Sequence, residues 1–184
     1  MFVARNLKQK NIAEYLLYMW QVEDLIRASN GDIDTLAQRV IALYHPTPGQ
    51  EQELRQWYSD LADMMRAENV LGKGHLQICK NVIIQLTELH QQLLHDPKYT
   101  DYSAAYYRAL PFIVELRAKK APGSAEEPEL ETCFEALYGV TLLRMQKKDI
   151  SAGTLQAAQA IAQLLDLLSS YYRKDQKGEL ELGK

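Results

Sequence analysis

The stretch NIAEYLLYMWQVEDLIR, residues 11–27, carries the pattern that recurs along most of this chain. Its large apolar residues recur at spacings of three and four, which places them on one face of an α-helix. They are Ile12, Tyr15, Leu16, Met19, Val22 and Ile26. We therefore predict a first helix over residues 8–29, ended by Asn30-Gly31, because glycine readily takes the left-handed backbone that follows a last turn.

The same spacing predicts six further helices. In chain order they cover residues 33–44, a segment that opens at Thr47-Pro48, and then 75–95, 102–119, 128–147 and 151–172. Runs of β-branched residues with two-residue alternation do not occur, so strands are not expected. Connections of about two to eight residues suit antiparallel neighbours. The predicted fold is all-α, a single-domain antiparallel bundle of about seven helices.

The fifth and sixth helices are expected to lie at the centre of the bundle, because apolar residues cover several of their sides. Pro111 lies inside the fifth helix and removes a backbone donor. We expect either a kink near Tyr107 or two shorter helices that meet there. Gly139 lies in the middle of the sixth helix, where glycine costs about 1 kcal/mol relative to alanine. Such a glycine indicates the close approach of another backbone.

Length and composition predict one domain. The chain has 184 residues, of which 47% are hydrophobic, and a domain typically has about 150 residues. We expect an all-helical domain over residues 1–172. The last residues, RKDQKGELELGK, mix charge with glycine and predict a mobile tail over 173–184. The segment KAPGSAEE, residues 120–127, is the clearest predicted loop and the first expected site of proteolysis.

Charge and targeting signals indicate a cytoplasmic protein. The formal net charge is -3, so no general attraction to nucleic acid or to an anionic membrane is expected. The first residues lack the apolar stretch of a secretory signal, and no window approaches the ~18 apolar residues of a membrane span. Cys79 and Cys133 are too few for a disulfide framework, although one bridge between them stays open.

Four long segments carry a resemblance to a known family. They are residues 11–27 together with NVIIQLTELHQQLL (81–94), YSAAYYRALPFIVELRAK (102–119) and ETCFEALYGVTLLRMQKK (131–148). These segments resemble an uncharacterised bacterial family of small proteins that is catalogued only as a domain of unknown function. The resemblance covers nearly the whole chain except its end. It implies a bacterial, cytosolic origin and a helical fold, and it supplies no activity, cofactor or catalytic residue.

Motifs for catalysis and metal binding are absent from the sequence. No Glu-x-x-His pair is present, as a di-iron bundle would need, and no Gly-x-Ser-x-Gly nucleophile turn occurs. The nearest metal-ligand grouping is His75 with Cys79, with His90 and Cys133 elsewhere. A zinc site needs about four converging ligands, and free cysteines are most often small core residues. We predict no cofactor, no metal and no catalytic residue.

Charged side chains interrupt three of the apolar helices, and buried charges are costly unless they are paired. One interpretation is structural: these residues form ion pairs between helices, or lie at an edge where their charged groups reach water. The other is a pocket between the first, fifth and sixth helices that binds an anionic small molecule through its arginines. The residues of that candidate pocket are Glu14, Tyr106, Tyr107, Arg108, Glu115, Tyr138 and Arg144.

The eleven tyrosines are first explained as the rims of ordinary helices, although tyrosine is also common where an apolar surface meets a partner. The leading hypothesis is a non-enzymatic helical interaction or scaffold protein that engages itself, as a homo-oligomer, or another protein. The alternative is a ligand-binding protein or enzyme that uses the pocket described above. A nucleic-acid-associated regulator comes third, because the basic clusters at 115–120 and 144–148 fall where cations complement the end of a helix.

Overall fold

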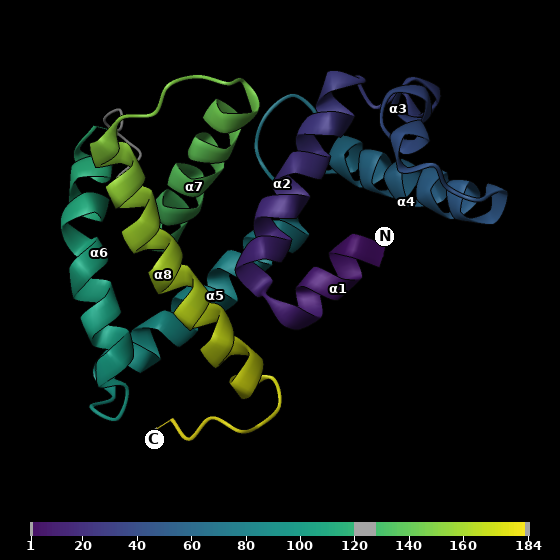
Figure 1. The fold of residues 1–184 in the computed structure, drawn as a ribbon. Coiled ribbons are helices and arrows are strands. Elements are labelled where there is room, and N and C mark those ends of the chain that lie inside the picture. The colour runs from purple at the N-terminus through teal and green to yellow at the C-terminus, as the bar shows by residue number, and fades with distance from the viewer. Residues whose placement is uncertain (1, 120–127, 183–184) are drawn as a thin grey trace. The chain divides into compact units, whose positions relative to one another are not determined.

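The computed structural model describes residues 2–119 and 128–182. Within these residues it contains eight α-helices, one short 3-10 helix and no strand (Figure 1), which confirms the predicted all-α fold of about seven helices. The helices are α1 (Phe2–Lys10), α2 (Ile12–Ala28), α3 (Ile33–Arg39), η1 (Ile41–Tyr44), α4 (Pro48–Ala67), α5 (Gln77–His95), α6 (Thr100–Ala118), α7 (Glu129–Met145) and α8 (Ala152–Asp175). The loop predicted at 120–127 lies outside the described residues.

The segment predicted as the first helix belongs to two helices, because the helical hydrogen-bond pattern is interrupted at Asn11. The Asn11 side chain accepts a hydrogen bond from the backbone N–H of Ala13 at 3.1 Å, which starts α2. The same N–H also donates to the hydroxyl of Ser169, at 3.2 Å. Asparagine competes with helical hydrogen bonds in this way and favours the position before a first turn. The predicted apolar face of α2 is confirmed, since all six of its residues are buried.

Side-chain caps begin three further helices. Asp32 accepts from the N–H of Thr35 at the start of α3, and Ser151 caps α8. Thr47 forms a complete capping box with Gln50 at the start of α4. Each cap satisfies N–H groups that the first turn leaves without helical partners.

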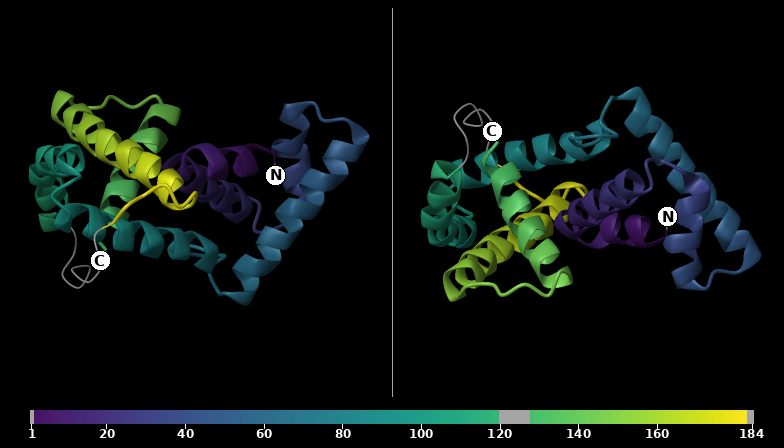
Figure 2. Two further views of the ribbon diagram at one scale, coloured as in Figure 1. Left: turned by 90° about the horizontal axis from the view of Figure 1, so that it is seen from below. Right: turned by 90° about the horizontal axis from the view of Figure 1, so that it is seen from above.

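The chain forms two compact units, which we call unit 1 (residues 1–10 and 14–81) and unit 2 (residues 11–13 and 82–184). In unit 1, α3 and η1 pack against α4 (Figure 2). In unit 2, α6, α7 and α8 lie side by side (Figure 1). The helix α8 extends three residues beyond the predicted end at Tyr172, to Asp175. A single domain over 1–172 with a mobile tail stays a prediction.

Helix α6 differs from its prediction in its surroundings. It runs without interruption through Pro111, so the alternative of two shorter helices is wrong. One face is buried, but Tyr107 and Val114 are 66% and 57% exposed, so α6 is not enclosed on all sides. Its apolar side chains outnumber the positions that face neighbouring helices, and the excess remains at the surface.

Candidate functional site

The four charged residues of the predicted pocket all lie at the surface. Arg108 and Glu115 of α6, Arg144 of α7 and Glu14 of α2 are exposed, so none of them carries the cost of a buried charge. The Glu115 carboxylate pairs with Lys119 one turn along the same helix, at 2.6 Å, and this pair is local to α6. Glu14 belongs to unit 1, whereas the other predicted pocket residues belong to unit 2.

The three predicted tyrosines occupy different surroundings. Tyr107 is mostly exposed, and Tyr138 is half-buried on α7. Tyr106 donates a long hydrogen bond of 3.5 Å to Glu129, and its ring meets His90 edge-on with the centroids 5.2 Å apart. Tyr106 therefore faces the core of unit 2, whereas Tyr107, its neighbour in sequence, faces outward.

A hollow of about 430 Å³ lies between α6, α7 and α8, and Glu115 is the only residue of the predicted pocket that lines it. Its apolar wall is formed by Phe112, Leu116, Val140 and Leu143. Among the described residues that line it, the charged ones are Glu115, Lys119 and Glu135. Two carboxylates and one ammonium group favour a cation over an anion, so the hollow lacks the arginines that the predicted anion site requires.

Gly139 also lines this hollow, which corrects its predicted role. Among the described residues, a Cβ atom built at Gly139 meets no atom within 4 Å outside its own stretch of helix. The predicted close approach of another backbone is therefore wrong. Instead, the missing side chain leaves the hollow wider at this point.

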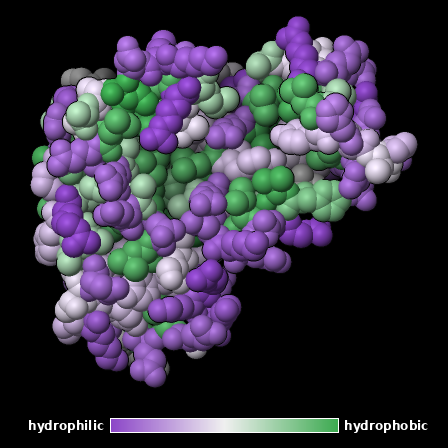
Figure 3. Space-filling model, in the orientation of Figure 1, coloured by the Kyte–Doolittle hydropathy of each residue, from purple (hydrophilic) through white to green (hydrophobic). Residues whose placement is uncertain are grey.

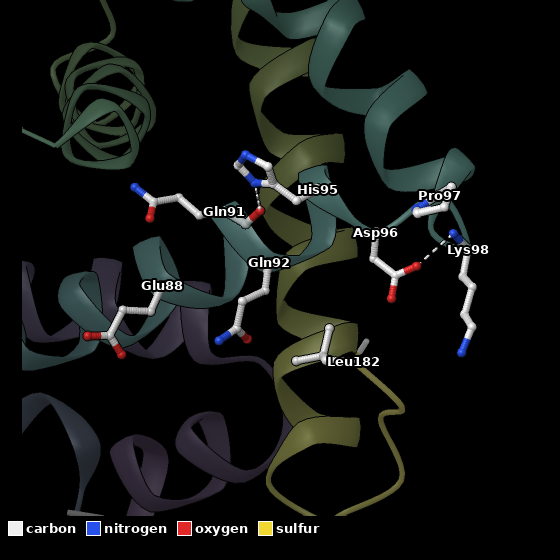
Figure 4. A pocket seen from close by; sticks show the side chains of 8 residues that line it. All are labelled: Glu88, Gln91, Gln92, His95, Asp96, Pro97, Lys98 and Leu182. Atoms are coloured by element: carbon white, nitrogen blue, oxygen red, sulfur yellow. Dashed lines mark hydrogen bonds between the residues drawn. The ribbon is translucent and has the colours of Figure 1, made fainter. Parts of the chain in front are cut away.

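A second hollow, of about 580 Å³, lies at the end of α5 and is lined mostly by residues with polar side chains (Figure 4). The residues that line it are Glu88, Gln91, Gln92, His95, Asp96, Pro97, Lys98 and Leu182. His95 bonds through Nδ1 to the Gln91 carbonyl at 2.7 Å, and Asp96 accepts from the N–H of Lys98 at 3.0 Å. Both contacts are local to the end of α5. The lining includes acidic side chains, Glu88 and Asp96, as well as the basic Lys98, so no single charge dominates the hollow.

The most strongly buried charge is Glu23 of α2, in unit 1, with no exposed surface. One carboxylate oxygen is 2.6 Å from Nδ1 of His75, and the other accepts from the N–H of Leu76 at 2.9 Å. Arg27 lies 3.8 Å from the same carboxylate and donates to the carbonyl oxygens of Val70 and Gly74. These contacts hold the segment between α4 and α5 against α2.

Sequence reasoning missed Glu23, although a signal was present. Met19, Glu23 and Ile26 follow one another at spacings of four and three, so the carboxylate falls on the apolar face of α2. Arg27, one turn further on, supplies the opposite charge. A glutamate on an apolar face with an arginine four residues later is the pattern of a buried, paired charge.

The two cysteines are free and buried, as the core interpretation predicted. Burial, together with the nearby Glu23 carboxylate, raises the pKa of the Cys79 thiol well above its usual range, so Cys79 stays a thiol rather than a nucleophilic thiolate. His75 and Cys79 lie in unit 1, whereas His90 and Cys133 lie in unit 2. Within residues 2–119 and 128–182, no three His, Cys, Asp or Glu residues are placed to hold a metal ion.

A buried histidine lies in the core of unit 2. His90 bonds through Nδ1 to the hydroxyl of Tyr102 at 2.5 Å, and its Nε2 is 3.9 Å from the carboxylate of Glu129. Burial lowers the pKa of His90 to about 4, and burial also raises the pKa of Tyr102. Both groups are therefore neutral at pH 7, and the pair acts as a hydrogen-bonded part of the core.

Unit 1 also exposes a group of large apolar side chains. Phe2 and Val3 of α1 are 51% and 47% exposed, and Leu43 and Tyr44 of η1 are 74% and 56% exposed. Phe2, Val3 and Tyr44 border a hollow of about 170 Å³ whose other walls are Tyr18, Pro46, Gln50, Leu54 and Tyr58. We call these nine residues, Leu43 included, the aromatic surface. Figure 3 shows green, hydrophobic surface on the face where Figure 1 places the N-terminus.

The comparisons with known proteins identify a family and no activity. A family model matches residues 1–179, and its description is Domain of unknown function (DUF4924). The chain therefore belongs to that family, in agreement with the resemblance in its sequence. No curated protein and no solved structure matches the chain. In the described part of the chain, no helix is long and apolar enough to cross a membrane.

Proposed function

We propose that this DUF4924 chain is a non-enzymatic helical interaction protein of the bacterial cytoplasm and that the aromatic surface is its binding surface. The supporting observation is the exposure of Phe2, Val3 and Tyr44 around one hollow, with the exposed Leu43 next to Tyr44 in the chain. Apolar surface exposed to water costs about 25 cal/mol per Å² relative to buried surface. A contiguous patch of such residues is typical of a site that a partner covers.

The composition of the aromatic surface supports the same role. Tyrosine is enriched in interfaces because its ring buries apolar area while its hydroxyl still finds a hydrogen-bond partner. Burial raises the pKa of Tyr18 to about 12, and burial also raises the pKa of Tyr58. Both hydroxyls therefore stay protonated at neutral pH; the half-buried Tyr18 remains able to donate a hydrogen bond to a partner, whereas Tyr58 is only 1% exposed.

The competing functions have weaker support. An anionic ligand was expected to bind Arg108 and Arg144, but neither lines the hollow between α6, α7 and α8. A nucleic-acid role would need a strongly basic surface, whereas the chain has 24 acidic and 21 basic residues. The aromatic surface, in contrast, consists of apolar and tyrosine side chains, which are the kinds of residue that bind the surface of another protein.

Photo-crosslinking in cells that naturally make the protein tests this proposal. Benzoylphenylalanine is placed at Tyr44 and, as a control, at Gln156, an exposed residue of α8. We expect irradiation to give one discrete adduct from position 44 and none from position 156. The absence of any adduct at position 44 would overturn the proposed function.

A further inference from the structure

We infer that the partner of the aromatic surface is a second copy of this chain, related to the first by a two-fold axis. The inference rests on the proposed function and names the partner. It follows from the charges carried by two of the helices that border the hollow: α1 contributes Phe2 and Val3, and α4 contributes Gln50, Leu54 and Tyr58.

Helix α1 is basic, and most of its side chains are exposed. It carries Arg5, Lys8 and Lys10 and no acidic residue. Only Ala4 is buried, although the helix is amphipathic, so its apolar residues gain little from packing within one copy. Arg5 and Lys8 are exposed, and the Lys8 ammonium group lies 5.6 Å from the centre of the Tyr15 ring.

Helix α4 has the opposite charge. It carries four acidic residues, Glu51, Glu53, Asp60 and Asp63, against two arginines. Glu51 pairs with Arg55, and Asp63 pairs with Arg66. Glu53 and Asp60 are exposed and seven residues apart, so they lie on one stripe beside the face that carries Leu54.

A basic helix on one side of a hollow and an acidic helix on the other make a self-complementary surface. In a two-fold dimer, each residue contact occurs twice, so α1 of one copy faces α4 of the other at two places. The shared hollow then buries Phe2 and Tyr44 of both copies between the two charged pairs. An anionic lipid surface is the less suitable occupant, because the acidic α4 would be repelled by it.

Charge reversal on one helix at a time tests this arrangement in the full-length protein. One variant carries Arg5→Glu and Lys8→Glu, and the other carries Glu53→Lys and Asp60→Lys. Each alone places like charges opposite each other and is expected to weaken self-association at least about tenfold in sedimentation velocity. Mixed together, the two variants restore opposite charges at both contacts, so a heterodimer of nearly wild-type affinity is expected.

A control variant and a second interface variant accompany the charge reversals. Arg108→Glu with Arg144→Glu reverses two exposed charges in unit 2 and is expected to leave the dimer unchanged. Leu43→Ser with Tyr44→Ser removes apolar contacts from exposed positions, where the fold is least affected, and is expected to give a monomer. Circular dichroism of each variant checks that the helices are intact.

The outcomes separate this inference from the proposed function. A wild-type protein that stays monomeric at 200 µM, or mixed variants that stay monomeric, would overturn self-association. If position 44 still crosslinks to a different protein, the proposed function stands and the second copy is the wrong partner. Self-adducts at position 44 together with recovery in the mixture would support both.

Discussion

Replacing Glu23 with alanine is expected to lower the free energy of unfolding by about 3–5 kcal/mol, because it deletes a fully buried carboxylate and leaves the donors bonded to it without an acceptor in the interior. The substitution removes the acceptor for His75 and for the N–H of Leu76. The Arg27 guanidinium, 3.8 Å from the Glu23 carboxylate, keeps its shorter ion pair with Asp24 at 2.8 Å, so most of the loss is expected from the His75 and Leu76 contacts. Urea unfolding followed by tryptophan fluorescence suits this measurement, since Trp20 and Trp57 both lie in unit 1.

The matched control is Glu14→Ala on the same helix. Glu14 is exposed, and its replacement is expected to change stability by no more than about 0.5 kcal/mol. Both substitutions remove one carboxylate from α2, so the difference between them measures burial and pairing rather than helix propensity. A loss below about 1 kcal/mol in Glu23→Ala would show that the buried cluster does not hold the segment between α4 and α5.

Acidification is expected to destabilise the protein through His90. Burial lowers the pKa of His90 to about 4 in the folded chain, whereas an exposed histidine has a pKa near 6.5. Between these values the unfolded chain binds the proton that the folded chain excludes, so stability falls as the pH falls from about 6.5 toward 4. From pH 7 to pH 5 this one group is expected to cost about 2 kcal/mol.

The contribution of His90 to this pH dependence is measured by comparison with the His90→Gln variant. Glutamine keeps a hydrogen-bonding side chain beside Tyr102 but does not titrate. Urea unfolding of both proteins at pH 7 and pH 5, followed by circular dichroism, gives the difference in pH dependence. Glu129, whose carboxylate lies 3.9 Å from His90 Nε2, is present in both proteins, as is Tyr106. Equal losses of stability in the two proteins on acidification would contradict this account of His90.

The sequence predicts the helices best where one apolar face alternates with a polar one. On α5 and the residue before it, seven apolar residues that share one helical face are buried: Leu76, Cys79, Val82, Ile83, Leu86, Leu89 and Leu93. The starts of α3, α4 and α8 were also predictable, because Asp32, Thr47 and Ser151 are caps with a local mechanism.

The sequence predicts less well where a long-range contact decides the structure. The break between α1 and α2 depends on the Asn11 side chain and on Ser169, which lies more than 150 residues away. Gly139 looked like a contact with another backbone but borders open space instead. Arg108 and Arg144 interrupted apolar runs, yet α6 and α7 are not enclosed at those positions, so the charges reach water.

The aromatic surface could not be predicted from any one segment. It joins side chains from α1, α2, η1 and α4, so no single helix pattern contains it. In the sequence, Phe2 and Val3 are typical of the start of a helix, and Tyr44 is typical of a residue that precedes a turn with proline. Only their placement around one hollow distinguishes them from the other apolar residues that a helical protein leaves at its surface.

Protection of Leu43 from solvent in the cell tests the central claim most directly. Cysteine is introduced at Leu43 or, as a control, at Gln156, and both variants are labelled with a maleimide in intact cells. Cys79 and Cys133 are buried and contribute little background. Because Leu43 is 74% exposed in a single copy, a bound partner is expected to slow its labelling at least about tenfold relative to position 156. Equal labelling rates at the two positions would mean that nothing covers the aromatic surface in the cell.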